Sequence, residues 1–74
     1  MANVHFLRKI ASDELRDTLF FATGIRAEKV RTRNDIVLSA NGFSIKIKSH
    51  KNIKVNGVQC NSISNAKYLI CDSW

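Results

Sequence analysis

Residues 36–60 read IVLSANGFSIKIKSHKNIKVNGVQC and carry the clearest structural signal in the chain. Two Asn-Gly pairs, Asn41-Gly42 and Asn56-Gly57, each stand between segments in which apolar and polar residues alternate. Asn and Gly tolerate the positive φ angles that both central residues of a type I′ turn require. The stretch therefore predicts two consecutive β-hairpins.

Placing each Asn-Gly pair at a turn gives the strands a self-consistent register. The residues that then face one another on one side are all apolar: Ile36 with Ile47, Leu38 with Ile45, Ala40 with Phe43, Ile53 with Cys60, and Val55 with Val58. A slip of one residue would move this whole set to the other face, so the match supports the register. The polar segment 49–52 connects the two hairpins.

The hairpins predict an antiparallel meander of three to four strands, near residues 36–40, 43–48, 53–55 and 58–60. One face of this sheet is apolar and forms the core. The other face carries Lys46, Lys48 and Lys54. The same alternation that buries the isoleucines thus places these lysines together on the opposite side.

Helices are expected on both flanks of the meander. The first runs from about 13 to 23, with Ser12 as N-cap, Asp13 and Glu14 in the first turn, and Gly24 just past its end. Its apolar stripe comprises Leu15, Leu19 and Ala22, widened by Phe20. A second, short helix runs from about 63 to 70, capped by Asn61 or Ser62, with Ile63, Ala66 and Leu69 or Ile70 on one face.

Two segments are less clearly patterned. Residues 1–11 fit either a short leading strand or an early helical turn. In residues 26–35, Lys29, Arg31 and Arg33 alternate with Val30 and Thr32, which predicts an exposed strand or extended arm. Asn34-Asp35 is then a turn or bulge before the first hairpin.

These elements predict an α+β fold in a single small basic domain, residues 1–74, with both helices on the apolar face. The order helix, strands, helix resembles that of double-stranded-RNA-binding domains. The second helix of that family starts with several lysines, whereas residues 62–67 here contain only Lys67. The resemblance therefore concerns element order, and no binding residue is transferred from it.

Charge is concentrated in the middle of the chain. Eight basic and two acidic residues lie between Arg26 and Lys54, so this window accounts for the whole net charge of +6. A one-sided positive field favours polyanionic partners such as nucleic acid or an acidic protein surface.

The sequence contains no motif typical of a disulfide-stabilised protein, a metal-binding protein or a membrane protein. Cys60 and Cys71 form no disulfide framework and have no metal-ligand spacing with His5 or His50. Arg8 and Lys9 interrupt the apolar residues near the N-terminus, and no run approaches the ~20 apolar residues that a membrane span needs. We expect a cytoplasmic protein without metal, cofactor or membrane attachment.

The first functional hypothesis is a non-enzymatic module that binds nucleic acid. Its candidate phosphate contacts are Lys46, Lys48, Lys54, Lys51, Arg31, Arg33 and Lys29. No aromatic residue falls on the basic face, so base stacking is not supported and duplex binding is favoured over single strands.

Two alternatives remain open. The chain fits a protein-binding regulator or inhibitor, such as a mobile-element protein that blocks a host nucleic-acid-handling complex, with Trp74, Tyr68 and a strand edge as its surface. A homodimer through such surfaces is a further option, since so small a core is marginal. The third hypothesis is a small ribonuclease in which His50, among lysines, acts as general base, although no second acid–base group is evident.

Overall fold

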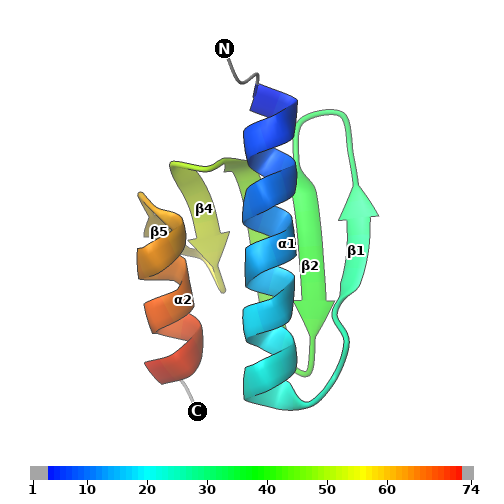
Figure 1. The fold of residues 1–74 in the computed structure, drawn as a ribbon, viewed down its shortest axis with the longest axis vertical. Helices are drawn as coiled ribbons and strands as arrows, with labels where there is room; N and C mark the ends of the chain where they lie inside the picture. Colours follow the sequence, from blue (N-terminus) through cyan, green and yellow to red (C-terminus); the bar gives the residue numbers. More distant parts are fainter. Residues whose placement is uncertain (1–3, 73–74) are drawn as a thin grey trace.

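The computed structural model describes residues 4–72 of the chain, with side chains from Phe6 onward. The elements in order are α1 (Val4–Thr23), β1 (Glu28–Arg31), β2 (Ile36–Ala40), β3 (Phe43–Ser49), β4 (Asn52–Val55), β5 (Val58–Cys60) and α2 (Ile63–Asp72). The strands form one antiparallel sheet in the order β1-β2-β3-β4-β5 (Figure 1). The α+β fold is confirmed, with five strands where three to four were predicted.

Both predicted hairpins are present with the predicted register. Asn41 and Gly42 have φ angles of 44° and 89°, and Asn56 and Gly57 have 50° and 86°. These positive values at both central residues are those of type I′ turns. All of the predicted apolar pairs face one another across β2–β3 and β4–β5.

The second turn is also tied to the neighbouring strand. The Asn56 side chain accepts a hydrogen bond from the Ser44 backbone N–H through Oδ1 at 2.7 Å. In return, the Asn56 N–H donates to the Ser44 carbonyl at 2.8 Å. These bonds continue the β3–β4 ladder into the turn and hold β4 in register beside β3.

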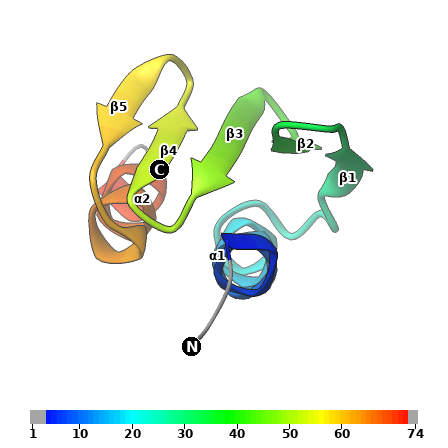
Figure 2. The ribbon, with the colours of Figure 1, turned by 90° about the horizontal axis from the view of Figure 1, so that it is seen from above.

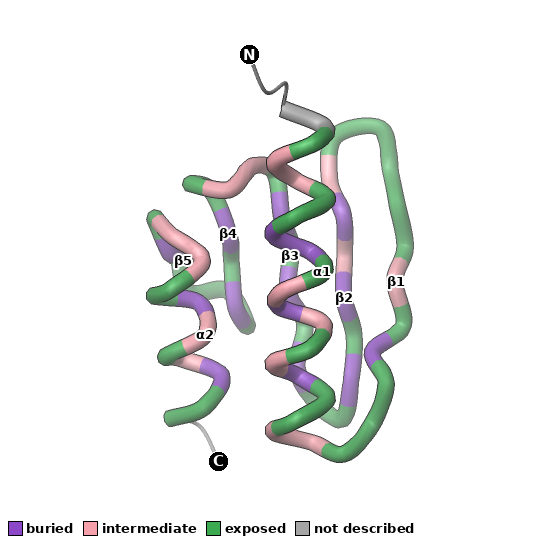
Figure 3. Tube along the Cα trace, viewed as in Figure 1, coloured by how far each residue is buried: buried purple, intermediate pink, exposed green. Residues whose placement is uncertain are grey.

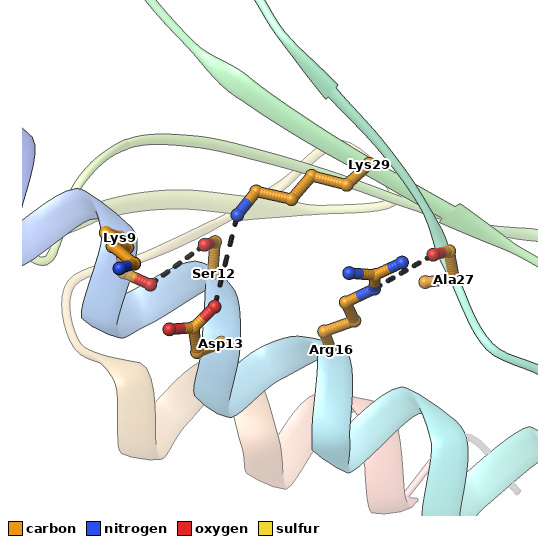
Figure 4. Close-up of polar contacts among 6 residues, drawn as sticks. All are labelled: Lys9, Ser12, Asp13, Arg16, Ala27 and Lys29. Atoms are coloured by element: carbon orange, nitrogen blue, oxygen red, sulfur yellow. Dashed lines mark hydrogen bonds and ion pairs between the residues drawn. The ribbon is translucent and has the colours of Figure 1, made fainter.

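Helix α1 starts earlier than predicted. It begins at Val4, so Ser12 lies inside the helix and its prediction as N-cap is wrong. Ser12 is fully buried, and its Oγ donates to the Lys9 carbonyl at 2.9 Å (Figure 4). The buried stripe that contains Leu15 and Leu19 extends back to Ala11, and packing of this longer stripe lengthens the helix.

The predicted helix ends agree better with the structure. Gly24 has a φ of 75° and its N–H donates to the Phe20 carbonyl at 2.8 Å, which confirms it as the C-terminal cap of α1. Ser62 caps α2, because its Oγ accepts a hydrogen bond from the Asn65 N–H at 3.1 Å.

The additional strand, β1, lies at the edge of the sheet and pairs with β2. The turn before β2 is confirmed, because the Thr32 N–H donates to the Asp35 carbonyl at 2.8 Å. None of the residues of β1 is buried. Its sequence therefore lacks the regular alternation of apolar and polar residues that marks the other strands. The sequence indicated an extended segment here but could not show that it joins the sheet.

Both helices cover the same face of the sheet (Figure 2). Helix α1 packs on β2 and β3, and α2 packs on β4 and β5. In β2, β3 and β4, buried residues alternate with exposed or half-buried ones (Figure 3). Two predicted core residues are exceptions: Val58, on an edge strand, is 52% exposed, and Phe20, on the outer side of α1, is 50% exposed.

Candidate functional site

The sheet face away from the helices, hereafter the open face, carries a continuous row of side chains across the sheet. The pairing of adjacent strands aligns Val30, Val37, Lys46, Lys54 and Gln59 in this row. Lys46 on β3 therefore stands directly opposite Lys54 on β4. Both lysines are exposed, and the row places their charges at its centre.

This lysine pair is electrostatically unfavourable in the free protein. Like charges directly opposite one another on antiparallel strands destabilise a sheet. The two ion pairs of the described residues join Lys29 to Asp13 and Lys67 to Glu14, so neither central lysine is neutralised. An anionic ligand would relieve this repulsion.

Lys48 extends the basic surface along β3. The pairing of β3 with β4 is irregular between Ile47 and Ser49, so Lys48 has no directly opposed residue on β4. The carbonyl of Lys48 accepts a hydrogen bond from Arg8 Nε at 3.0 Å, which ties this bulge to α1. Lys48 and Lys51 are both exposed, and Lys51 lies in the turn that follows.

The remaining predicted phosphate contacts do not join the open face. Lys29 pairs with Leu38 and Arg31 with Ile36, two core-facing residues, so both cations lie on the helix side of β1. Lys29 Nζ is 4.0 Å from Asp13 Oδ1 (Figure 4). Arg33 lies in the turn between β1 and β2. The structure thus brings Lys46 and Lys54 together, places Lys48 at the bulge further along β3, and separates Lys29 and Arg31 from the lysine pair.

The edge strand β1 is held over α1 by polar contacts. Arg16 Nε donates to the Ala27 carbonyl at 3.0 Å, close to the Lys29–Asp13 pair (Figure 4). The alternation of residues in the sequence predicted that Lys29 and Arg31 lie on the same side of their strand. Only the pairing of β1 with β2 shows that this is the helix side. The side of the sheet on which these cations lie could therefore not be predicted from the sequence.

Among the described residues, His50 and the two cysteines form no catalytic cluster or metal site. His50 lies in the turn between β3 and β4, and within the described part of the chain no hydrogen bond or ion pair joins it to another side chain. No three His, Cys, Asp or Glu side chains within the described residues form a candidate metal site. Burial raises the pKa of the Cys60 thiol, which disfavours the nucleophilic thiolate.

An exposed apolar cluster on the outer side of α1 was not predicted. Phe21 is 86% exposed and contacts Phe20 edge to face, with ring centroids 6.3 Å apart. These rings line a groove of about 630 Å³ together with Asp13, Arg16, Asp17 and Arg26. Two consecutive phenylalanines were an available signal, because a helix cannot turn both toward one core. Tyr68 on α2 is also exposed, whereas Trp74 lies outside the described residues.

Comparisons with known proteins add no functional assignment. No protein-family model matches the chain, and searches of curated proteins and of solved structures find no match. Neither described helix has the length and apolar character needed to cross a bilayer. The site must therefore be interpreted from its own chemistry.

The repulsion between the paired lysines predicts a stability change. Lys46→Glu should raise the free energy of unfolding in urea by about 0.5–1 kcal/mol at low salt, because it places opposite charges across β3 and β4. The gain should shrink as salt screens the pair. Lys48→Glu changes the net charge equally but has no opposed residue, so it is the matched control. Equal effects of the two variants would contradict the proposed pairing.

Proposed function

We propose that the protein binds the phosphate backbone of nucleic acid through the open face, with duplexes preferred over single strands. The observation that carries this proposal is the direct opposition of Lys46 and Lys54 without a carboxylate in their row. A sheet that served only for solubility would be more stable with acids interspersed among these lysines.

The distribution of acids strengthens the argument. Asp13, Glu14 and Asp17 lie on α1 and Asp72 lies on α2, so most carboxylates belong to the helix layer. The field of the open face is therefore positive and would steer a polyanion toward that side. Glu28 does lie on the open face, but it pairs with Ser39 at the edge of the sheet, in a different row from the lysine pair.

The side chains also support a particular mode of binding. Each lysine ammonium acts as a compact point charge that neutralises a phosphate and releases a condensed counterion. Such contacts position a nucleic acid without reading its sequence. The described residues of the open-face rows include no aromatic ring, so the stacking used by single-strand binders has no platform.

The salt dependence of binding tests this function. For a fluorescent duplex of ~20 base pairs, each phosphate contact contributes about −0.9 to the slope of log affinity against log salt. Contacts from Lys46, Lys48 and Lys54 predict a slope of about −2.7, falling to about −0.9 in Lys46→Gln/Lys54→Gln. Fluorescence anisotropy measures both slopes.

The matched control is Lys9→Gln/Lys67→Gln, which removes the same charge from the helix layer. Its Lys67–Glu14 ion pair is partly exposed, so the cost in stability is below about 1 kcal/mol. The control should keep the steep salt dependence. No duplex binding at low salt, or equal losses in the two double variants, would refute the function.

A second candidate function, protein binding, is favoured by the exposed rings of Phe20 and Phe21. Asp13 and Asp17 line the same groove together with Arg16 and Arg26. Asp13 is already paired with Lys29, whereas Asp17 makes no ion pair among the described residues. We therefore propose as occupant a protein helix that presents apolar and basic side chains. Such a helix would bury the rings and pair a basic side chain with Asp17.

This candidate is tested with a synthetic amphipathic helix of leucine and lysine, ~18 residues and ~27 Å long. Nuclear magnetic resonance (NMR) titration should show shifts along the outer side of α1, and Phe20→Ser/Phe21→Ser should weaken binding about tenfold. The matched leucine–glutamate peptide should instead perturb the open face. Lysine-peptide shifts that survive the double substitution would eliminate this candidate.

A further inference from the structure

Three arginines surround a small hollow on the helix side of the sheet. The hollow has a volume of about 250 Å³ and is lined by Arg8, Arg31, Thr32, Arg33 and Ile36. It lies where the turn between β1 and β2 reaches the same end of the molecule as the N-terminal half of α1 (Figure 1). Residues far apart in the sequence thus bring their guanidinium groups to one place.

The local structure explains why these arginines converge. Arg31 pairs with buried Ile36, which directs it to the helix side of β1. The following turn is closed by Thr32, whose Oγ1 accepts a hydrogen bond from the Asp35 N–H at 2.9 Å. Arg33 therefore sits in a hydrogen-bonded turn rather than in a free loop.

Arg8 reaches the hollow from α1. Its Nε donates to the Lys48 carbonyl at 3.0 Å, so one edge of the guanidinium is anchored to the sheet. This bond fixes the orientation of the group and leaves its terminal N–H groups for another acceptor. The Arg8 guanidinium is therefore already oriented before a ligand binds, so binding does not bear the entropy cost of ordering it.

Within residues 4–72, no carboxylate forms an ion pair with the three guanidinium groups. The ion pairs of the described residues involve Lys29 and Lys67, and none involves Arg8, Arg31 or Arg33. Asp35 is the last residue of the turn, but its Oδ1 is buried without a hydrogen-bond partner and forms no ion pair with an arginine among the described residues. The hollow therefore concentrates positive charge without an internal counter-ion.

We propose that this hollow is a binding site for a phosphate group. The planar fork of a guanidinium matches two oxygens of a tetrahedral anion, which makes arginine the preferred residue for such recognition. The volume is below the ~300–1,000 Å³ of pockets that hold drug-sized ligands and suits a small anion. The site is separate from Lys46 and Lys54, which lie on the opposite face of the sheet.

The phosphate has two chemical sources, free inorganic phosphate and the terminal phosphate of a nucleic acid strand. The site itself does not depend on the proposed nucleic-acid function, and only the second source rests on it. A terminal phosphate held here would add an end-specific contact to backbone binding on the open face.

The test is an NMR titration of the full chain with inorganic phosphate in a phosphate-free buffer. The backbone signals of residues 31–36 and of Arg8 should shift saturably. Arg31→Gln/Arg33→Gln should weaken phosphate binding about tenfold or more, because it removes two charge-assisted contacts. Both arginines are exposed, so the fold should persist, as circular dichroism will check.

Two matched variants keep the outcome specific. Lys29→Gln removes a cation from the same strand but outside the hollow and should bind phosphate as the unmodified protein does. Lys46→Gln/Lys54→Gln should also retain phosphate binding, so a failure of the nucleic-acid proposal would leave this test intact. Absence of saturable shifts, or phosphate binding that survives Arg31→Gln/Arg33→Gln, would overturn the site.

Duplexes with and without a 5′-phosphate then distinguish the two sources. A higher affinity for the phosphorylated duplex, abolished by Arg31→Gln/Arg33→Gln, assigns the site to strand ends. Equal duplex affinities together with saturable inorganic phosphate binding assign it to free phosphate.

Discussion

The pairing of β3 with both of its neighbours is the constraint on which the architecture rests. Ile45 and Ile47 are fully buried at the centre of the sheet, and their partners on β2 and β4 are buried with them. The type I′ turn at Asn41-Gly42 fixes the register of β2 with β3, and the hydrogen bonds between Ser44 and Asn56 hold β4 in register beside β3. Because side chains alternate along a strand, burial of Ile45 and Ile47 forces Lys46, which lies between them, to the other face.

The arrangement of charge follows from the same register. A strand that buried its isoleucines but paired Lys46 with an acid would be more stable, so the Lys46–Lys54 pair indicates a surface shaped by something other than stability. The helices cover the opposite face and carry most of the acids. The molecule is therefore two-sided, with a basic open face and helices in which four acidic and four basic residues balance.

The structure could be predicted from the sequence where local chemistry determines it. The Asn-Gly turns, the glycine cap at Gly24 and the serine cap at Ser62 were all recognisable, and the lysines of the open face followed from them. The sequence was insufficient where tertiary packing decides. Burial of Ser12 and the extension of α1 depend on the sheet beneath the helix, and the side on which Arg31 lies depends on the pairing of β1 with β2. For that reason, the sequence did not predict the arginine hollow.

The central claim, that the open face contacts nucleic acid, is tested most directly by NMR of the lysine side chains with the duplex present. The ε-methylene signals of Lys46, Lys48 and Lys54 should shift as duplex is added, while those of Lys9 and Lys67 on the helices stay in place. Shifts confined to the helix lysines, or no shift at low salt, would contradict the account.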